Sequence, residues 1–266
     1  MATLIEAVKR QALLTFAKNR SSVYFEENLS KLRLLASKLT SSDVELDKSL
    51  LLRDVPNSNP KSSWTPNSRL APVTYIEIFE NPDITIGIFI LRNGARLPLH
   101  DHPLMYGILK VIHGKVRIHS YSPLSKNDLT DEQVSETRFV DKCGKDYSSH
   151  DGEISSMELF RQVSLFAVKE PEVVVDQSDD ACLLSPRRGN LHEIHTVDGP
   201  AAFVDILSPP YDTDIPGVGP RPCRYFREVS HPDDNLVKKL IRIPSPSDYW
   251  SDTAPYTGPP CNSTDE

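Results

Sequence analysis

Residues 94–114 (GARLPLHDHPLMYGILKVIHG) constrain the fold more than any other part of the chain. They contain two histidines, His100 and His102, and in an extended strand such i and i+2 residues point to the same side of a sheet. Pro98 before the pair and Pro103 after it favour the edge or bend of a strand over the interior of a helix. Two imidazoles on one side can reach one metal ion. The alternative is two partly exposed histidines at a strand end.

Short apolar runs on both sides of this stretch predict a β-structure. The runs at 84–91 and 108–112 are rich in β-branched residues. More such runs follow at regular spacing with turn residues between them, which is typical of an antiparallel sandwich or barrel. They read VTYIEIF, VSLFAVKEPEVVV, ACLLSP, LHEIHTV and AAFVDILSPP. Gly114 is expected to form a hairpin turn between ILKVI and VRIHSY.

The N-terminal part of the chain is predicted to be helical. Apolar residues recur at helical spacing over 3–19 and again over 24–39. The Ser-Ser-Asp at 41–43 is expected to cap a short third segment that ends near residue 53. Residues 54–68 are rich in proline, serine and asparagine and predict a loop.

These patterns predict two parts in the chain. Residues 1–53 form a helical segment packed on the outside of a barrel, and residues 69–266 form the barrel domain itself. A polar stretch at about 122–158 predicts a surface insertion between barrel strands. The proline-rich chain after Ser230 is expected to wrap the barrel, with Trp250 as an anchor.

Composition narrows the classes of function. The 266 residues are 38% hydrophobic and 25% charged, as in an ordinary globular protein. The net charge of −7 and the lack of a long basic block argue against a nucleic acid or an anionic membrane as partner. The chain start lacks the apolar core of a signal peptide, so the cytoplasm is expected, although its amphipathic character leaves a mitochondrial presequence open. The four scattered cysteines form no C-x-x-C motif.

A third candidate ligand lies far along the chain. Gly189 permits a tight turn before a strand that carries His192. His195 lies three residues later, so in an extended strand it faces the other side and is expected to face solvent. The remaining histidines are interpreted as surface or loop residues: His113, His119, His150 and His231.

With these residues in place, the chain resembles the cupin family. The pattern from Gly94 through His100 and His102 is similar to the first cupin motif. A glutamate normally follows four or five residues after the second histidine, but here Tyr106 and Gly107 occupy those positions. The usual carboxylate ligand is therefore missing.

The second cupin motif is matched with two departures. Gly189-x-x-His192 resembles its core, but Pro186 stands one residue further from the glycine than usual, and Thr196 stands where asparagine often follows. Three imidazoles without a carboxylate resemble the iron site of thiol dioxygenases. The resemblance implies an all-β fold, the cupin double-stranded β-helix barrel (jelly roll), with N-terminal helices packed outside.

Several separated blocks resemble the family of 2-aminoethanethiol (cysteamine) dioxygenases and plant cysteine oxidases. They are PLHDHP, GILKVIHGKVRI, GNLHEI and GPAAFVDILSPPYD, and residues 122–180 match least. The resemblance implies one iron(II) per chain, held by His100, His102 and His192. It implies that both atoms of O2 are added to the sulfur of cysteamine or of a protein's N-terminal cysteine, giving a sulfinic acid. An oxygen-sensing role through protein degradation is implied in the same way.

Four further residues are candidates for the site. Asp205 and Tyr211 lie in a block that matches the cavity lining of this family, where Asp205 could hold a substrate ammonium group and Tyr211 could orient the thiol or oxygen. Cys223 and Tyr225 share a face if extended, and the family's matching pair can form a thioether crosslink. The alternatives are that Asp205 is a hydrogen-bonded core residue, that Tyr211 only packs in the core, and that Cys223 is an inert buried cysteine beside Tyr225.

Ligand type alone leaves the metal open. Three-histidine sites also bind zinc for hydrolysis or hydration. The alternatives are therefore a cupin that uses zinc or manganese for hydrolysis or isomerisation, and a non-catalytic cupin that binds a ligand. A monomer is expected for the thiol dioxygenase.

Overall fold

The computed structural model describes the chain at residues 2–17, 23–52, 71–136, 139–140, 146–147, 163–216, 219–229 and 236–261. Several expectations fall outside these residues: the loop at 54–68, His150 and His231. None of the helices in the described ranges combines the length and apolar character needed to cross a bilayer.

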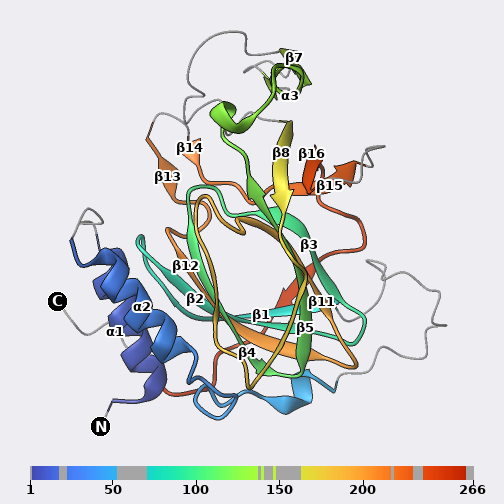
Figure 1. Cartoon of the computed structure of the whole chain (residues 1–266). Helices are drawn as coiled ribbons and strands as arrows, with labels where there is room; N and C mark the ends of the chain where they lie inside the picture. Colours follow the sequence, from blue (N-terminus) through green and yellow to red (C-terminus); the bar gives the residue numbers. More distant parts are fainter. Residues whose placement is uncertain are drawn as a thin grey trace.

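Two β-sheets form the body of the molecule (Figure 1). The first sheet has the order β10-β4-β12-β2-β1-β17. Its strands are β1 (Val73–Glu80), β2 (Thr85–Leu91), β4 (Tyr106–His113), β10 (Cys182–Leu184), β12 (Ala201–Ser208) and β17 (Ser251–Thr253). All its pairings are antiparallel except that of β17 with β1.

The second sheet has the order β11-β3-β15-β16-β8-β5-β9, and it closes on itself because β11 also pairs with β5. Its strands are β3 (Arg96–Asp101), β5 (Lys115–Pro123), β8 (Ser164–Lys169), β9 (Val173–Asp176), β11 (Leu191–Thr196), β15 (Tyr225–Val229) and β16 (Val237–Ile243). Closure leaves few unpaired strand edges, which is how all-β barrels avoid edge-to-edge association. The predicted all-β cupin barrel is confirmed.

Small elements complete the described chain. Those within or beside the predicted insertion are η2 (Lys126–Asp128), α3 (Asp131–Glu136), β6 (Phe139–Val140) and β7 (Asp146–Tyr147). Figure 1 shows α3 and β7 beyond one end of the barrel. The others are η1 (Lys48–Leu50), β13 (Asp214–Ile215) and β14 (Gly219–Pro220).

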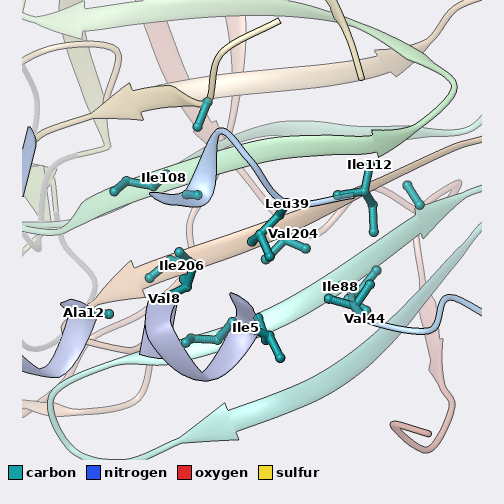
Figure 2. Close-up of a cluster of buried hydrophobic side chains, with 14 of the residues drawn as sticks. Ile5, Val8, Ala12, Leu39, Val44, Ile88, Ile108, Ile112, Val204 and Ile206 are labelled. Carbon is teal, nitrogen blue, oxygen red and sulfur yellow. The ribbon is translucent and has the colours of Figure 1, made fainter. Parts of the chain in front are cut away.

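The N-terminal helices cover the outer face of the first sheet. Helix α1 (Leu4–Phe16) begins at a capping box between Thr3 and Glu6 and packs beside α2 (Phe25–Ala36). Figure 2 shows side chains of α1 such as Ile5 against sheet residues such as Ile88. Because the opposite face of this sheet is also covered, β2 is buried almost along its whole length and reads as a continuous apolar run.

A second core lies between the two sheets. It includes Leu91 and Phe203 from the first sheet and Leu97 and Ile194 from the second, all at most 5% exposed. Packing of the two inner faces holds the sheets together through the hydrophobic effect. The cavity described below opens within this layer.

Two local expectations were wrong. Gly114 does form a turn, with φ of +69°, but β4 and β5 belong to different sheets and do not pair, so no hairpin exists there. The chain crosses from one sheet to the other, as jelly rolls require. The 3-10 helix at 48–50 is capped by Asp47, whose carboxylate accepts from the backbone N–H of Ser49 at 2.8 Å, and not by the serines at 41–42.

The C-terminal part contributes more than a wrapping tail. Strand β16 is an inner strand of the second sheet, between β15 and β8. Strand β17 then pairs with β1 on the first sheet. Trp250 is only half-buried, whereas Tyr249 beside it packs against the core between the sheets.

Candidate metal centre and substrate cavity

Three histidines from two strands converge inside the barrel. His100 lies on β3, His102 follows the end of that strand, and His192 lies on β11 directly opposite His100. One ring nitrogen from each lies within 4.8 Å of the others, and all three residues are at most 9% exposed. Neighbouring strands therefore bring distant parts of the sequence to one point.

A β-bulge in β3 directs the side chain of His100 into the cavity. The register moves from His192 opposite His100 to Ile194 opposite Leu97, so β3 carries one more residue than β11 over this stretch. Bulges re-aim side chains, and here both Leu97 and His100 face the cavity. The bulge contains Pro98, whose carbonyl accepts a hydrogen bond from Nδ1 of His100 at 2.8 Å. That bond leaves Nε2 of His100 as the free lone pair.

Tyr211 sets the tautomer of the second histidine. Its hydroxyl lies 2.6 Å from the carbonyl oxygen of Asp101 and 2.9 Å from Nδ1 of His102. A carbonyl can only accept, so the hydroxyl donates to Asp101 and accepts from His102. The Nε2 atom of His102 is then unprotonated and points at Nε2 of His192, 3.2 Å away.

The donor set fits one metal ion. Two nitrogens bound to one tetrahedral ion at about 2.0–2.1 Å lie roughly 3.3 Å apart, close to the separation of the two Nε2 atoms. Burial lowers the pKa of His100, His102 and His192, so the three imidazoles are neutral and available as ligands near neutral pH. Within the described residues, no carboxylate belongs to this cluster.

The histidines open onto a cavity of about 260 Å³ between the two sheets. All the residues that the sequence selected line it: His100, His102, His192, Asp205, Tyr211, Cys223 and Tyr225. The register explains part of this arrangement, because His192, His100 and Tyr225 lie in one row across β11, β3 and β15. Their assigned roles stay predictions.

Asp205 places a carboxyl group among apolar surroundings. It lies on β12 and is half-buried in the cavity wall. Desolvation raises its pKa to about 7, and a hydrogen bond from the backbone of Ile206 offsets this only in part. A cationic group beside Asp205 would favour the carboxylate and restore the charge.

Cys223 and Tyr225 meet at the same cavity. The side chain of Tyr211 lines the same cavity. Desolvation by the surrounding protein raises the pKa of the Cys223 thiol to about 12, although part of the residue is exposed to solvent. Desolvation also raises the pKa of Tyr225. The thiol and the phenol are thus neutral at physiological pH.

A buried ion pair behind the histidines was missed by the sequence analysis. Arg224 donates to the carboxylate of Asp101 through its backbone N–H at 3.0 Å and its Nε at 2.7 Å, and both side chains are at most 4% exposed. Asp101 separates His100 from His102, and Arg224 stands between Cys223 and Tyr225. The pair therefore joins the two motifs. The sequence did contain a signal for this ion pair, because each motif has one charged residue at its centre and the two charges are opposite.

Aromatic residues of the cavity wall were also missed. Phe89 of β2 and Phe203 of β12 stack with ring centroids 5.4 Å apart, and Tyr249 completes this side. No pattern in the sequence separates such residues from ordinary core residues, because a cavity wall has the same apolar composition as a core.

This fold and this cluster define a cupin barrel with a candidate three-histidine metal centre. Comparison with known proteins is more specific. The chain belongs to the PCO_ADO family, whose model matches residues 35–261. The expected resemblance is thereby confirmed.

The curated relatives agree with this family. The 2-aminoethanethiol dioxygenases of Mus musculus and Homo sapiens are each 33% identical, over 97% of this chain and 96% and 97% of their own lengths. Plant cysteine oxidase 1 of Arabidopsis thaliana is 25% identical over 80% of this chain and 60% of its own length. Among solved structures, a cupin superfamily protein from Desulfitobacterium hafniense covers 57% of this chain at 9% identity, with a TM-score of 0.29.

Proposed function

We propose that this chain is an iron(II)-dependent thiol dioxygenase that converts cysteamine, or the N-terminal cysteine of a protein, to the sulfinic acid. The observation that carries the proposal is a buried three-histidine cluster, free of carboxylates in the described chain, that opens onto the cavity containing Asp205. Family membership and the printed names of the relatives support it. The reaction, RSH + O2 giving RSO2H, balances without a co-substrate.

The donor set explains the choice of a thiol. Three neutral imidazoles leave the charge of a divalent ion undiminished, so an anionic thiolate is a favoured further ligand. When bound at the Nε2 atoms, iron(II) would supply open coordination positions and the redox chemistry that O2 requires. The protein's part is to hold the thiol and O2 within reacting distance and to limit water in the cavity.

Asp205 is proposed to select amine-bearing thiols. Cysteamine and an N-terminal cysteine both carry a free amine two carbons from the sulfur. An ammonium group beside Asp205 would form an ion pair in a poorly solvated cavity, where such pairs are strong. This contact would fix the other end of the substrate relative to the histidines. Tyr211 is proposed to act mainly by holding His102, since its hydroxyl already contacts that ring.

We also propose that Cys223 and Tyr225 form a thioether crosslink under turnover. A C–S bond would form between the thiol sulfur and a ring carbon of the phenol as one S–H and one C–H bond break, and the two hydrogen atoms released would reduce O2 to hydrogen peroxide. Their shared position at the cavity supports this. A cytosolic location and a role in oxygen-dependent protein degradation belong to the same proposal.

The decisive experiment is mass spectrometry of a peptide that begins with cysteine, after aerobic incubation with the iron-loaded protein. We expect a gain of about 32 Da, the two oxygen atoms of the sulfinic step. The same peptide with an acetylated N-terminus should react far more slowly, and a His192→Ala variant should be inactive. Thiol-dependent oxygen uptake is measured alongside. Metal binding without such uptake would overturn the proposal in favour of a zinc or manganese cupin or a non-catalytic binding protein.

A further inference from the structure

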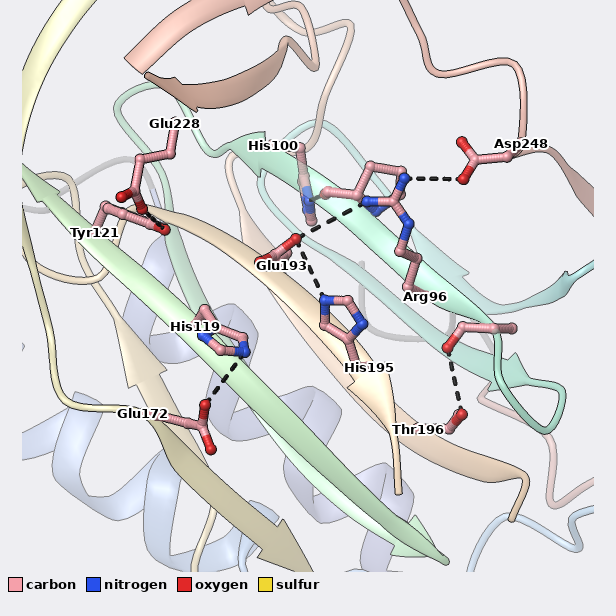
Figure 3. Close-up of polar contacts among 12 residues, drawn as sticks. Arg96, His100, His119, Tyr121, Glu172, Glu193, His195, Thr196, Glu228 and Asp248 are labelled. Carbon is pink, nitrogen blue, oxygen red and sulfur yellow. Dashed lines mark hydrogen bonds and ion pairs between the residues drawn. The ribbon is translucent and has the colours of Figure 1, made fainter. Parts of the chain in front are cut away.

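A second cluster of metal-binding side chains lies on the outer face of the barrel. His119 of β5 is paired in register with Glu193 of β11, and His195 lies two residues further on the same face (Figure 3). One donor atom from each lies within 4.8 Å of the others. His192 and Ile194 alternate with these residues and face the cavity. The outer cluster and the candidate metal centre therefore occupy opposite faces of one strand.

The three side chains are oriented toward one another. Nε2 of His195 lies 3.3 Å from a carboxylate oxygen of Glu193, and the two imidazole rings are 5.7 Å apart at 78°. Their side chains are 23% exposed at His119, 24% at Glu193 and 34% at His195. An ion from solvent can reach this cluster directly.

The neighbouring arginines do not prevent the carboxylate of Glu193 from binding a metal ion. Arg96 approaches Glu193 at 3.9 Å but lies closer to Asp248, at 2.9 Å. Arg117 is paired with Glu172 at 3.0 Å. Each arginine thus has a nearer carboxylate of its own, and Figure 3 shows Arg96 outside the space between the two histidines.

We propose that His119, Glu193 and His195 bind a second divalent metal ion of the zinc class, such as Zn²⁺, Ni²⁺ or Cu²⁺. Two imidazoles and a carboxylate are a donor set that such ions favour. Donors on a tetrahedral ion lie roughly 3.4 Å apart, so small rotations of these half-exposed side chains complete the site. Glu172, whose carboxylate lies 3.4 Å from Nε2 of His119, or a water molecule would fill the fourth position. The ion would link β5 to β11.

The test separates the outer site from the inner histidines. In a full-length His100→Ala/His192→Ala background, Zn²⁺ affinity is measured by competition with a chromophoric chelator. We expect one equivalent of Zn²⁺ to bind. An added His195→Asn substitution should weaken binding at least about tenfold, as loss of a ligand does. His113→Asn is the matched control, because His113 is a half-buried histidine outside the cluster and should leave the affinity unchanged.

A second measurement guards against a background that fails to fold, which thermal melting would reveal. In the otherwise wild-type protein, Zn²⁺ stoichiometry is expected to be two per chain and to fall to one in His119→Asn/His195→Asn. The proposal is overturned if the folded background binds no Zn²⁺, or if affinity and stoichiometry are the same with and without these histidines. Neither readout depends on enzymatic turnover.

Discussion

At the scale of single residues, the hydroxyl of Tyr211 decides what His102 can do. It joins the ring nitrogen Nδ1 to the backbone of Asp101, and so directs Nε2 of His102 toward His192. Partners of this kind orient metal ligands and raise their basicity. Asp205 acts through its charge. Little solvent stabilises its carboxylate, so a cationic group beside it would do so.

Replacing Tyr211 with phenylalanine should weaken metal binding. The ring of His102 loses its partner and can adopt the other tautomer, so we expect the affinity for iron(II) to fall about 10- to 100-fold. Anaerobic competition with a chelator measures this. Tyr225→Phe is the control, since Tyr225 lines the same cavity but its ring packs against Tyr249, whereas the ring of Tyr211 packs against His102. Equal losses in both variants would contradict the role assigned to Tyr211.

Substituting Asp205 with asparagine should impair binding of amine-bearing thiols. Loss of the ion pair is expected to raise KM for cysteamine at least about tenfold, in line with a charge-assisted contact of 1.5–3 kcal/mol. The KM for a thiol of the same length without the amine should hardly change. Asp212→Asn, at another acidic residue of the cavity, serves as the control. A uniform change for both thiols would count against ammonium recognition.

Asp205 also makes stability depend on pH. Its pKa is raised from 3.8 to about 7 on folding, so between these values the unfolded chain is ionised at this residue and the folded chain is not. Unfolding then releases a proton, and rising pH favours the unfolded state. Metal-free Asp205→Asn should therefore lose less stability than wild type from pH 4 to 7, by at most about 4 kcal/mol because solvent screens a half-buried group. Urea unfolding at several pH values measures the difference, and parallel pH profiles would refute it.

At the scale of elements, turns and bulges decide where side chains point. The bulge in β3 turns His100 into the cavity, and the turn at Gly114 carries the chain from the first sheet to the second. Both features depend on backbone geometry more than on side-chain chemistry. Replacing a turn glycine with alanine, which adds one methyl group, is therefore enough to test the backbone geometry.

Gly114→Ala should destabilise the protein more than Gly94→Ala. Both glycines have positive φ, +69° and +75°, which costs an alanine about 1–2 kcal/mol. A Cβ on Gly114 would also lie 2.2 Å from the carbonyl oxygen of Pro200, whereas one on Gly94 meets nothing within 4 Å. We expect a further loss of about 1–3 kcal/mol at Gly114. Urea unfolding measures both variants, and similar values would show that the backbone near Pro200 yields freely.

At the scale of the whole molecule, the helices and the barrel share one core. Residues of α1 and α2 pack into a single cluster with the outer face of the first sheet. Arg33 of α2 also donates through Nε to the carbonyl of Ala181, the residue before β10, at 2.7 Å. The predicted helical segment and barrel domain differ in their sequence patterns but share one hydrophobic core. We therefore expect the two parts to unfold together.

Leu32→Ala tests this cooperation. Leu32 is fully buried in the shared cluster, so the substitution should cost about 2–5 kcal/mol, whereas Leu34→Ala, 62% exposed on the same helix, should stay within about 0.5 kcal/mol. Far-ultraviolet circular dichroism and tryptophan fluorescence should report one common transition in all variants. Loss of helical signal before the barrel signal would show that the helices fold separately.

The sequence by itself determined most of the elements and the candidate metal ligands. Periods of two and 3.6 residues located most strands and both long helices, because side-chain burial follows backbone geometry. The spacing of His100 and His102 predicted that they share a face, and the turn at Gly189 pointed to His192. These are local properties, and a linear pattern records them.

Only the tertiary structure decided which distant residues meet. Strand pairing placed His192 opposite His100, set Asp101 against Arg224, and brought His119 to Glu193 on the outer face. It also put β4 and β5 in different sheets where a hairpin was expected. Register between strands far apart in sequence depends on the packing of the whole barrel, because each pairing is chosen by the faces that must be buried together.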